Sequence, residues 1–158
     1  MVTASDVVVN KLKKEAEKAG LRLEEYVLDL VLRDFDPRER AEEYVKVAEN
    51  LLEQAKDELE KGEVRQAAEK LWGAAALAVK AYAEFLEGRR PASHGELWEY
   101  ARKMAREMGL WVREAWMYAN GMHVCFYEGW CGEEDVEDSL NRIRTLVRKV
   151  KENIVGKE

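Results

Sequence analysis

The fold is decided by residues 69–80, which read EKLWGAAALAVK. This composition predicts a helix with almost no polar face, and such a helix must be enclosed by other helices. Five of its residues are small and let neighbouring backbones approach closely: Gly73, Ala74, Ala75, Ala76 and Ala78. The segment therefore predicts the central helix of an all-α bundle.

The composition bounds the class of protein. A chain of 158 residues with 47% hydrophobic residues suits one domain with a short appendage. No apolar run reaches the ~18 residues that span a bilayer, and residues 1–6 lack the features of a signal peptide. We therefore expect a cytoplasmic protein with no membrane partner.

Charge is dense and nearly balanced. The chain has 26 basic and 32 acidic residues, and the resulting net charge of −6 disfavours non-specific binding of nucleic acid. The charged fraction of 37% fits a thermophilic chain that is stabilised by surface ion pairs.

Apolar residues at three-four spacing predict about five helices between residues 36 and 155. The first starts at Asp36-Pro37, where Asp36 suits the cap and Pro37 the first turn, and it ends at Gly62. The others are expected at about 63–87, between Ser93 and Gly109, at about 110–128, and over the stretch that carries Val136 to Ile154. No alternating stretch predicts a strand, and short connections favour an up-and-down bundle.

Residues 1–35 predict a separate N-terminal helical hairpin. Its helices are expected at about 6–18 and 23–33, joined at Gly20. The pair is similar to the two helices of a ribbon-helix-helix DNA-binding domain, but the strand that would enter the DNA groove is missing. We therefore favour an arm for packing or dimerisation, because an exposed apolar stripe is stabilised by burial against another surface.

Five short segments carry a family resemblance: ERA at 39–41, KG at 61–62, QAAEKLW at 66–72, SHGEL at 93–97 and MHVCFYEG at 122–129. Through them, residues 36–150 resemble the archaeal PaREP family, which is placed in the HEPN superfamily of helical bundles. The resemblance implies a HEPN-like bundle, a homodimer, and a toxin–antitoxin or defence-like setting. It implies no settled activity.

Many HEPN proteins are metal-independent ribonucleases in which four to six residues separate an arginine from a following histidine, on a helix at a dimer interface. His123 matches that histidine, but positions 116–118 read Trp-Met-Tyr. Arg113 lies roughly 15 Å of helix rise before His123, too far to replace the missing cation. Stabilising a phosphate in the transition state needs such a donor. Arg142 or Arg144 of the last helix remains the alternative source.

A polar and aromatic stripe on the 110–128 helix is the candidate ligand-binding site. Trp116, Asn120, His123 and Tyr127 follow three-four spacing, and Glu128 adds a carboxylate. Of these five, His123, Asn120 and Tyr127 are the candidates for catalysis, since they can orient a ligand or a water. The alternative is a structural histidine that is bonded within the bundle or to a partner subunit.

The remaining chemistry-bearing residues point to no metal and no cofactor. His94 is expected to be an exposed residue in the first turn of a helix. Residues 123 and 125 point to different sides of their helix, which does not suit a tetrahedral metal site. Cys125 and Cys131 are expected to be reduced thiols, with a local disulfide as the alternative in a hyperthermophile.

Two functions follow from these patterns. The leading hypothesis is a non-catalytic binding or assembly module that acts as a homodimer and has a protein partner. The alternative is a metal-independent ribonuclease or nucleotide-binding protein that uses His123. The missing arginine and the net charge make RNA or a nucleotide the less favoured ligand.

Overall fold

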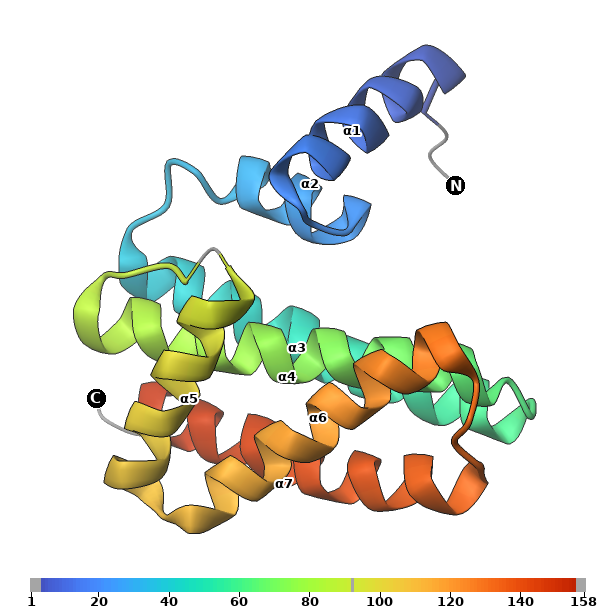
Figure 1. The fold of residues 1–158 in the computed structure, drawn as a ribbon. Coiled ribbons are helices and arrows are strands. Elements are labelled where there is room, and N and C mark those ends of the chain that lie inside the picture. Colours follow the sequence, from blue (N-terminus) through green and yellow to red (C-terminus); the bar gives the residue numbers. More distant parts are fainter. Residues whose placement is uncertain (1–3, 92, 156–158) are drawn as a thin grey trace. The chain divides into compact units, whose positions relative to one another are not determined.

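The structure, a computed structural model, describes residues 4–91 and 93–155 (Figure 1). Over these residues it contains seven helices and no strand, which confirms the predicted all-α class. The chain divides into two compact units, and the boundary along the chain falls between Asp36 and Pro37. None of the helices in the described residues has the length and hydropathy that a bilayer crossing requires.

The first unit is a hairpin of two helices, α1 (Asp6–Ala19) and α2 (Leu23–Val31). The Ser5 side chain caps α1 by accepting a hydrogen bond from the backbone N–H of Val8 at 3.4 Å. Gly20 ends α1 in the left-handed conformation with φ of 70°, which a glycine adopts without strain. The unit buries little and leaves Val8 exposed, together with its neighbour Val7.

The second unit contains the other five helices: α3 (Pro37–Glu60), α4 (Val64–Glu87), α5 (His94–Met108), α6 (Leu110–Glu128) and α7 (Glu133–Val155). Short connections join α3 to α4 and α6 to α7, so each pair forms an antiparallel hairpin (Figure 1). Helix α4 packs against all of α3, α5, α6 and α7. It is therefore the centre of the unit, as the sequence predicts.

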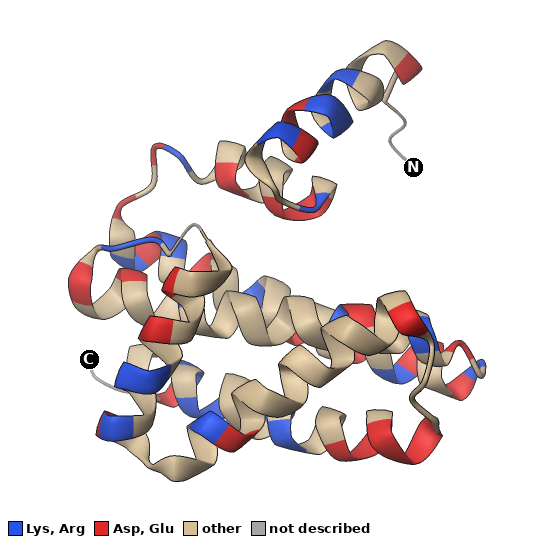
Figure 2. Cartoon of the chain, in the orientation of Figure 1, with Lys and Arg blue, Asp and Glu red and all other residues tan. Residues whose placement is uncertain are grey.

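Helix α4 is buried without interruption from Leu71 to Glu84. Figure 2 shows few charged residues on α4 and α6, and many on α7. The one carboxylate inside this stretch, Glu84, accepts a hydrogen bond from the Arg40 guanidinium of α3 at 3.0 Å. Because Glu84 is only 2% exposed, its carboxylate needs the Arg40 guanidinium to offset the cost of removing the charge from water.

Substitution of Ala75 tests the enclosure of α4. Ala75 is completely buried, so Ala75→Glu places an unpaired charge among apolar side chains. We expect a loss of about 5 kcal/mol or more, comparable to the whole stability of a domain this size. Circular dichroism should show an unfolded or aggregated variant. A melting curve like that of the wild type would refute the central placement of α4.

Candidate functional site

Both histidines of the chain lie together against one tryptophan. The His123 ring of α6 stacks on the Trp72 ring of α4, with centroids 4.6 Å apart. The His94 ring, at the start of α5, stacks on the same indole at 5.3 Å and lies 5.3 Å from His123. These distances are typical of favourable ring pairs. Residues separated by 29 positions in sequence thus form one three-ring cluster.

More aromatic side chains extend this cluster on both sides. Tyr127 meets His123 edge to face at 5.3 Å, one turn further along α6. On the inner side, Trp116 packs on Trp72 at 5.3 Å and meets Trp98 of α5 at 5.9 Å. Trp72 and Trp116 are buried, His123 is half-buried, and His94 and Tyr127 are exposed. The cluster therefore has a buried indole floor and an open edge of imidazole and phenol.

Local structure fixes the two histidines. Ser93 caps α5, and its hydroxyl accepts a hydrogen bond from the backbone N–H of Glu96 at 3.1 Å. This cap fixes the start of α5, and the side chain of its first residue, His94, lies over the indole of Trp72. His123 reaches the same ring because it shares a face of α6 with Trp116 and Tyr127.

Arg65 of α4 caps the C-terminal end of α6 beside the cluster. Its Nε and Nη2 donate to the carbonyl oxygen of Phe126 at 2.9 and 2.7 Å, and Nη2 also donates to that of Tyr127 at 3.0 Å. The last carbonyls of a helix lack partners within the helix, and a cation there suits the helix dipole. Arg65 thus fixes the backbone that carries Tyr127, and its donors point to these carbonyls.

The two cysteines are bonded to each other, which corrects the expectation of reduced thiols. Gly129, with φ of 73°, turns the chain back after α6. The Cα atoms of Cys125 and Cys131 consequently lie 5.7 Å apart, a separation that suits a disulfide. The Cys131 N–H also donates to the Cys125 sulfur at 3.3 Å. The bridge ties the last turn of α6 to the connection with α7.

The other candidates from the sequence have different surroundings. The Asn120 side chain donates to the carbonyl oxygen of Trp116 on its own helix at 2.7 Å, so one of its donors is already used. Glu128 is the exposed last residue of α6. Arg142 pairs with Glu114 at 3.4 Å and lies over the Tyr118 ring. No group of three or more metal-ligating side chains occurs in the part of the chain that the structure describes.

Sequence reasoning missed Trp72, Trp98 and Arg65 as parts of this site. Trp72 was available as a signal, because it is the large aromatic residue in a run of small ones on α4. Its contact with His94 depends on how α5 crosses the bundle, which helical spacing does not specify. Arg65 gave no signal, because its partners are carbonyl oxygens 61 and 62 positions away.

The cluster offers stacking surfaces and two imidazoles. Two neighbouring histidines can act as a general acid and a general base. The turn before His123 supplies no cation, and Arg65 is directed to the helix end. The geometry therefore supports binding of a planar or aromatic group more directly than cleavage of a phosphate ester.

We expect Arg65→Gln to loosen this end of α6. Loss of the charged hydrogen bonds at an exposed site should lower the free energy of unfolding by about 1 kcal/mol and Tm by about 3 °C. The NMR signals of the His123 and Tyr127 rings should shift. Arg106→Gln, at an exposed arginine of α5, is the control and should change neither quantity. Unchanged ring signals in Arg65→Gln would contradict the positioning role.

Comparison with known proteins agrees with this fold. The archaeal PaREP1/PaREP8 family model matches residues 43–147, more than half of the chain. A crystal structure of a protein from Sulfolobus solfataricus is 25% identical, covers 69% of this chain and 96% of that chain, and superposes with a TM-score of 0.58. None of the curated proteins matches the chain. The chain belongs to the archaeal PaREP1/PaREP8 family.

Proposed function

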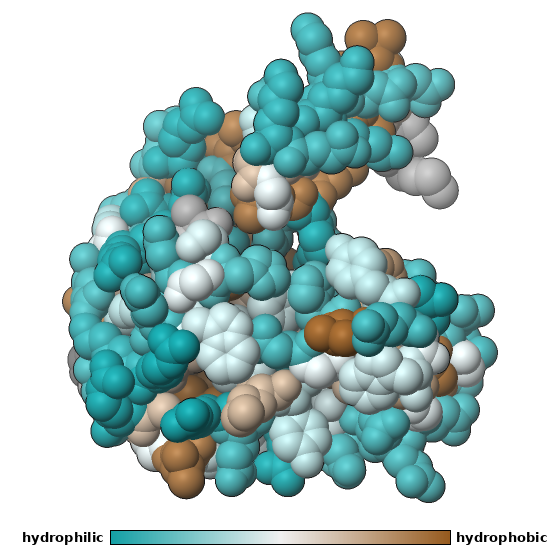
Figure 3. All heavy atoms as spheres, viewed as in Figure 1, coloured by the Kyte–Doolittle hydropathy of each residue, from teal (hydrophilic) through white to brown (hydrophobic). Residues whose placement is uncertain are grey.

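We propose that this member of the PaREP1/PaREP8 family is a homodimeric, non-catalytic binding module whose bundle is HEPN-like. The observation that carries the proposal is the placement of exposed apolar side chains. In the second unit most of them lie on α6 and the connection after it: Leu110, Met117, Tyr118, Val124, Tyr127 and Trp130. In Figure 3 a diagonal band of brown and pale side chains lies over α6.

An apolar helix face of this kind favours a second copy of the chain as its cover. Soluble proteins seldom leave contiguous apolar surface open, and two-fold dimers are the commonest oligomers. Gly121 lies in the middle of this face, and a Cβ added there would meet nothing within 4 Å. A second helix can therefore approach α6 closely at that point. The antiparallel pairs α3/α4 and α6/α7 and the short α5 support the HEPN-like assignment.

The ring cluster is the proposed ligand site of the dimer. Tyr127 belongs to both features, since it meets His123 and is one of the exposed apolar side chains of α6. A ligand or protein partner at His94 and His123 would therefore lie beside the second subunit. A toxin–antitoxin or defence-like setting is part of this proposal on the HEPN resemblance alone, and a cytoplasmic location is part of it on the composition of the chain.

The dimer is tested by lysine substitutions at two apolar residues that are equally exposed. Val124 on α6 and Leu86 on α4 are each 44% exposed. Sedimentation at micromolar concentration should give twice the chain mass of 18.3 kDa for the wild type and for Leu86→Lys. Val124→Lys should give the single-chain mass, because the charge would be buried in the interface. A monomeric wild type, or a dimer that is unchanged in Val124→Lys, would refute the proposal.

The second candidate function is RNA cleavage, and the proximity of His94 and His123 favours it. We expect the wild type to leave single-stranded and transfer RNA intact without metal, because the turn before His123 carries no cation and Arg65 is bonded to the end of α6. His123→Ala should then remain dimeric and show no lost activity. RNA cleavage that disappears in His123→Ala or His94→Ala would replace the binding module with a ribonuclease.

A further inference from the structure

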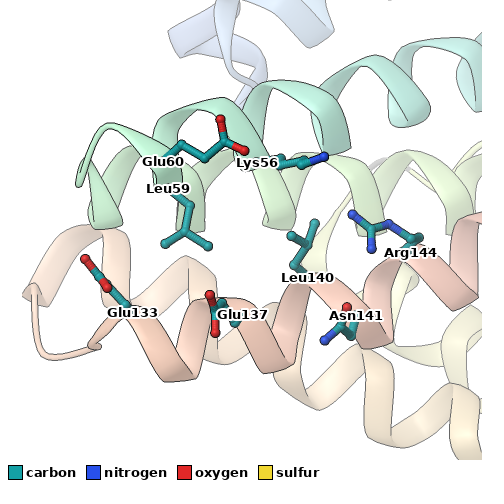
Figure 4. A pocket seen from close by; sticks show the side chains of 8 residues that line it. All are labelled: Lys56, Leu59, Glu60, Glu133, Glu137, Leu140, Asn141 and Arg144. Atoms are coloured by element: carbon teal, nitrogen blue, oxygen red, sulfur yellow. The ribbon is translucent and has the colours of Figure 1, made fainter.

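A polar pocket lies away from the ring cluster, between the last two turns of α3 and the first half of α7. Its volume is about 400 Å³, within the range of small-ligand sites (Figure 4). It is lined by Lys56, Leu59 and Glu60 from α3, and by Glu133, Glu137, Leu140, Asn141 and Arg144 from α7. All of the charged side chains among these are exposed.

The charges in this pocket are sorted by sign. Figure 4 shows Lys56 and Arg144 at one end of the pocket and Glu133 at the other, with the apolar side chains of Leu59 and Leu140 between them. Glu60 follows Lys56 by one helical turn, so the two side chains are neighbours on α3, and Figure 4 shows the Glu60 carboxylate between Lys56 and Glu133. None of the five charged side chains forms an ion pair with another group in the described residues.

The same pair of helices uses charge differently two turns away. Lys151 of α7 donates to Glu49 of α3 at 3.0 Å, so opposite charges face each other there. Lys56 lies seven residues after Glu49 on α3, and Arg144 lies seven residues before Lys151 on α7. Seven residues are about two turns, so Lys56 and Arg144 repeat the earlier positions with like charges. Like charges that face each other repel, weakly where both are exposed, and an anion between them offsets this repulsion.

We propose that this pocket binds a linear ampholyte, a ligand with a carboxylate at one end and an ammonium group at the other. The carboxylate would lie between Lys56 and Arg144, and the ammonium group between Glu60 and Glu137. The aliphatic segment covers Leu59 and Leu140. Glu133 lies in the first turn of α7, where a negative charge suits the helix dipole without any ligand. Of the three carboxylates it is therefore the weakest indication of an ammonium ligand.

The spacing of the charges sets the length of the ligand. Lys56 and Glu60 are one turn apart, about 6 Å along the axis of α3. A lysine side chain with a free α-carboxylate spans a distance of this order between its two charges. An ω-amino acid and the C-terminal lysine of a peptide share this chemistry. The proposal does not depend on the dimer or on the ring cluster.

The test is an NMR titration of the full chain with 6-aminohexanoate. Backbone signals of Lys56, Glu137 and Arg144 should shift, with a Kd on the order of 1 mM because exposed ion pairs are weak. Binding should weaken at high salt. Hexanoate, hexylamine and glycine are the matched probes, since each lacks one charge or the spacing. Absent shifts, or shifts of equal size with any of these three, would overturn the proposal.

Two charge reversals on α7 separate the ligand site from the fold. Arg144→Glu removes the anion-binding end and gives Lys56 an opposite charge. It should weaken 6-aminohexanoate binding at least about tenfold and leave Tm unchanged or raised. Lys151→Glu should lower Tm slightly, through loss of the Glu49 pair, and keep binding. Binding that survives in Arg144→Glu would overturn the proposal.

The source of the ligand is distinguished by a second pair of probes. A short peptide that ends in lysine is compared with the same peptide whose C-terminus is amidated. Tighter binding of the free-carboxylate peptide than of 6-aminohexanoate assigns the pocket to protein C-termini, and equal or weaker binding assigns it to the small ω-amino acid. Equal binding of the amidated peptide and the free-carboxylate peptide would contradict the ampholyte requirement.

Discussion

Helix α4 must be kept out of water along its whole middle, and the rest of the second unit is arranged to satisfy this constraint. From Leu71 to Glu84 every residue is buried, and four helices contact α4. The alanines and Gly73 contribute little apolar area each, so the stabilisation comes from the close approach of the helices that cover them. Those helices must therefore bring their own large side chains into the core, such as the buried Leu51 and Tyr44 of α3.

The ring cluster follows from the same constraint. Trp72 is too large to be covered by one helix, so α5 and α6 both contribute rings to it, through His94, His123 and Trp116. At the other end of this stretch the Glu84 carboxylate is held by Arg40. A helix that is apolar in its middle thus has two ends with specific polar chemistry. The site lies at the end where the covering rings remain partly open to solvent.

Much of the fold was predictable because it depends on local pattern. Glycines and proline mark the helix ends, and three-four spacing marks the buried faces, so the boundaries of α4 and α6 agree closely with the predicted ones. The stripe of Trp116, His123 and Tyr127 was predictable for the same reason. The contact of His94 with His123 was not, because it depends on the path of the chain between α4 and α5. No periodicity of the sequence encodes that path.

The disulfide shows a second limit of sequence reasoning. Whether Cys125 and Cys131 meet depends on the turn at Gly129, and the redox preference of a compartment says nothing about that geometry.

The grouping of charged side chains in the pocket was likewise not predictable from the sequence. The sequence shows Lys56 and Arg144 as two of many exposed cations, and only the packing of α3 against α7, in the register where Lys151 meets Glu49, brings them to one pocket. Pairs of opposite charge along a helix interface are explained by the fold alone. A pair of like charges in the same register has no such explanation, and it is therefore the stronger indication of a ligand.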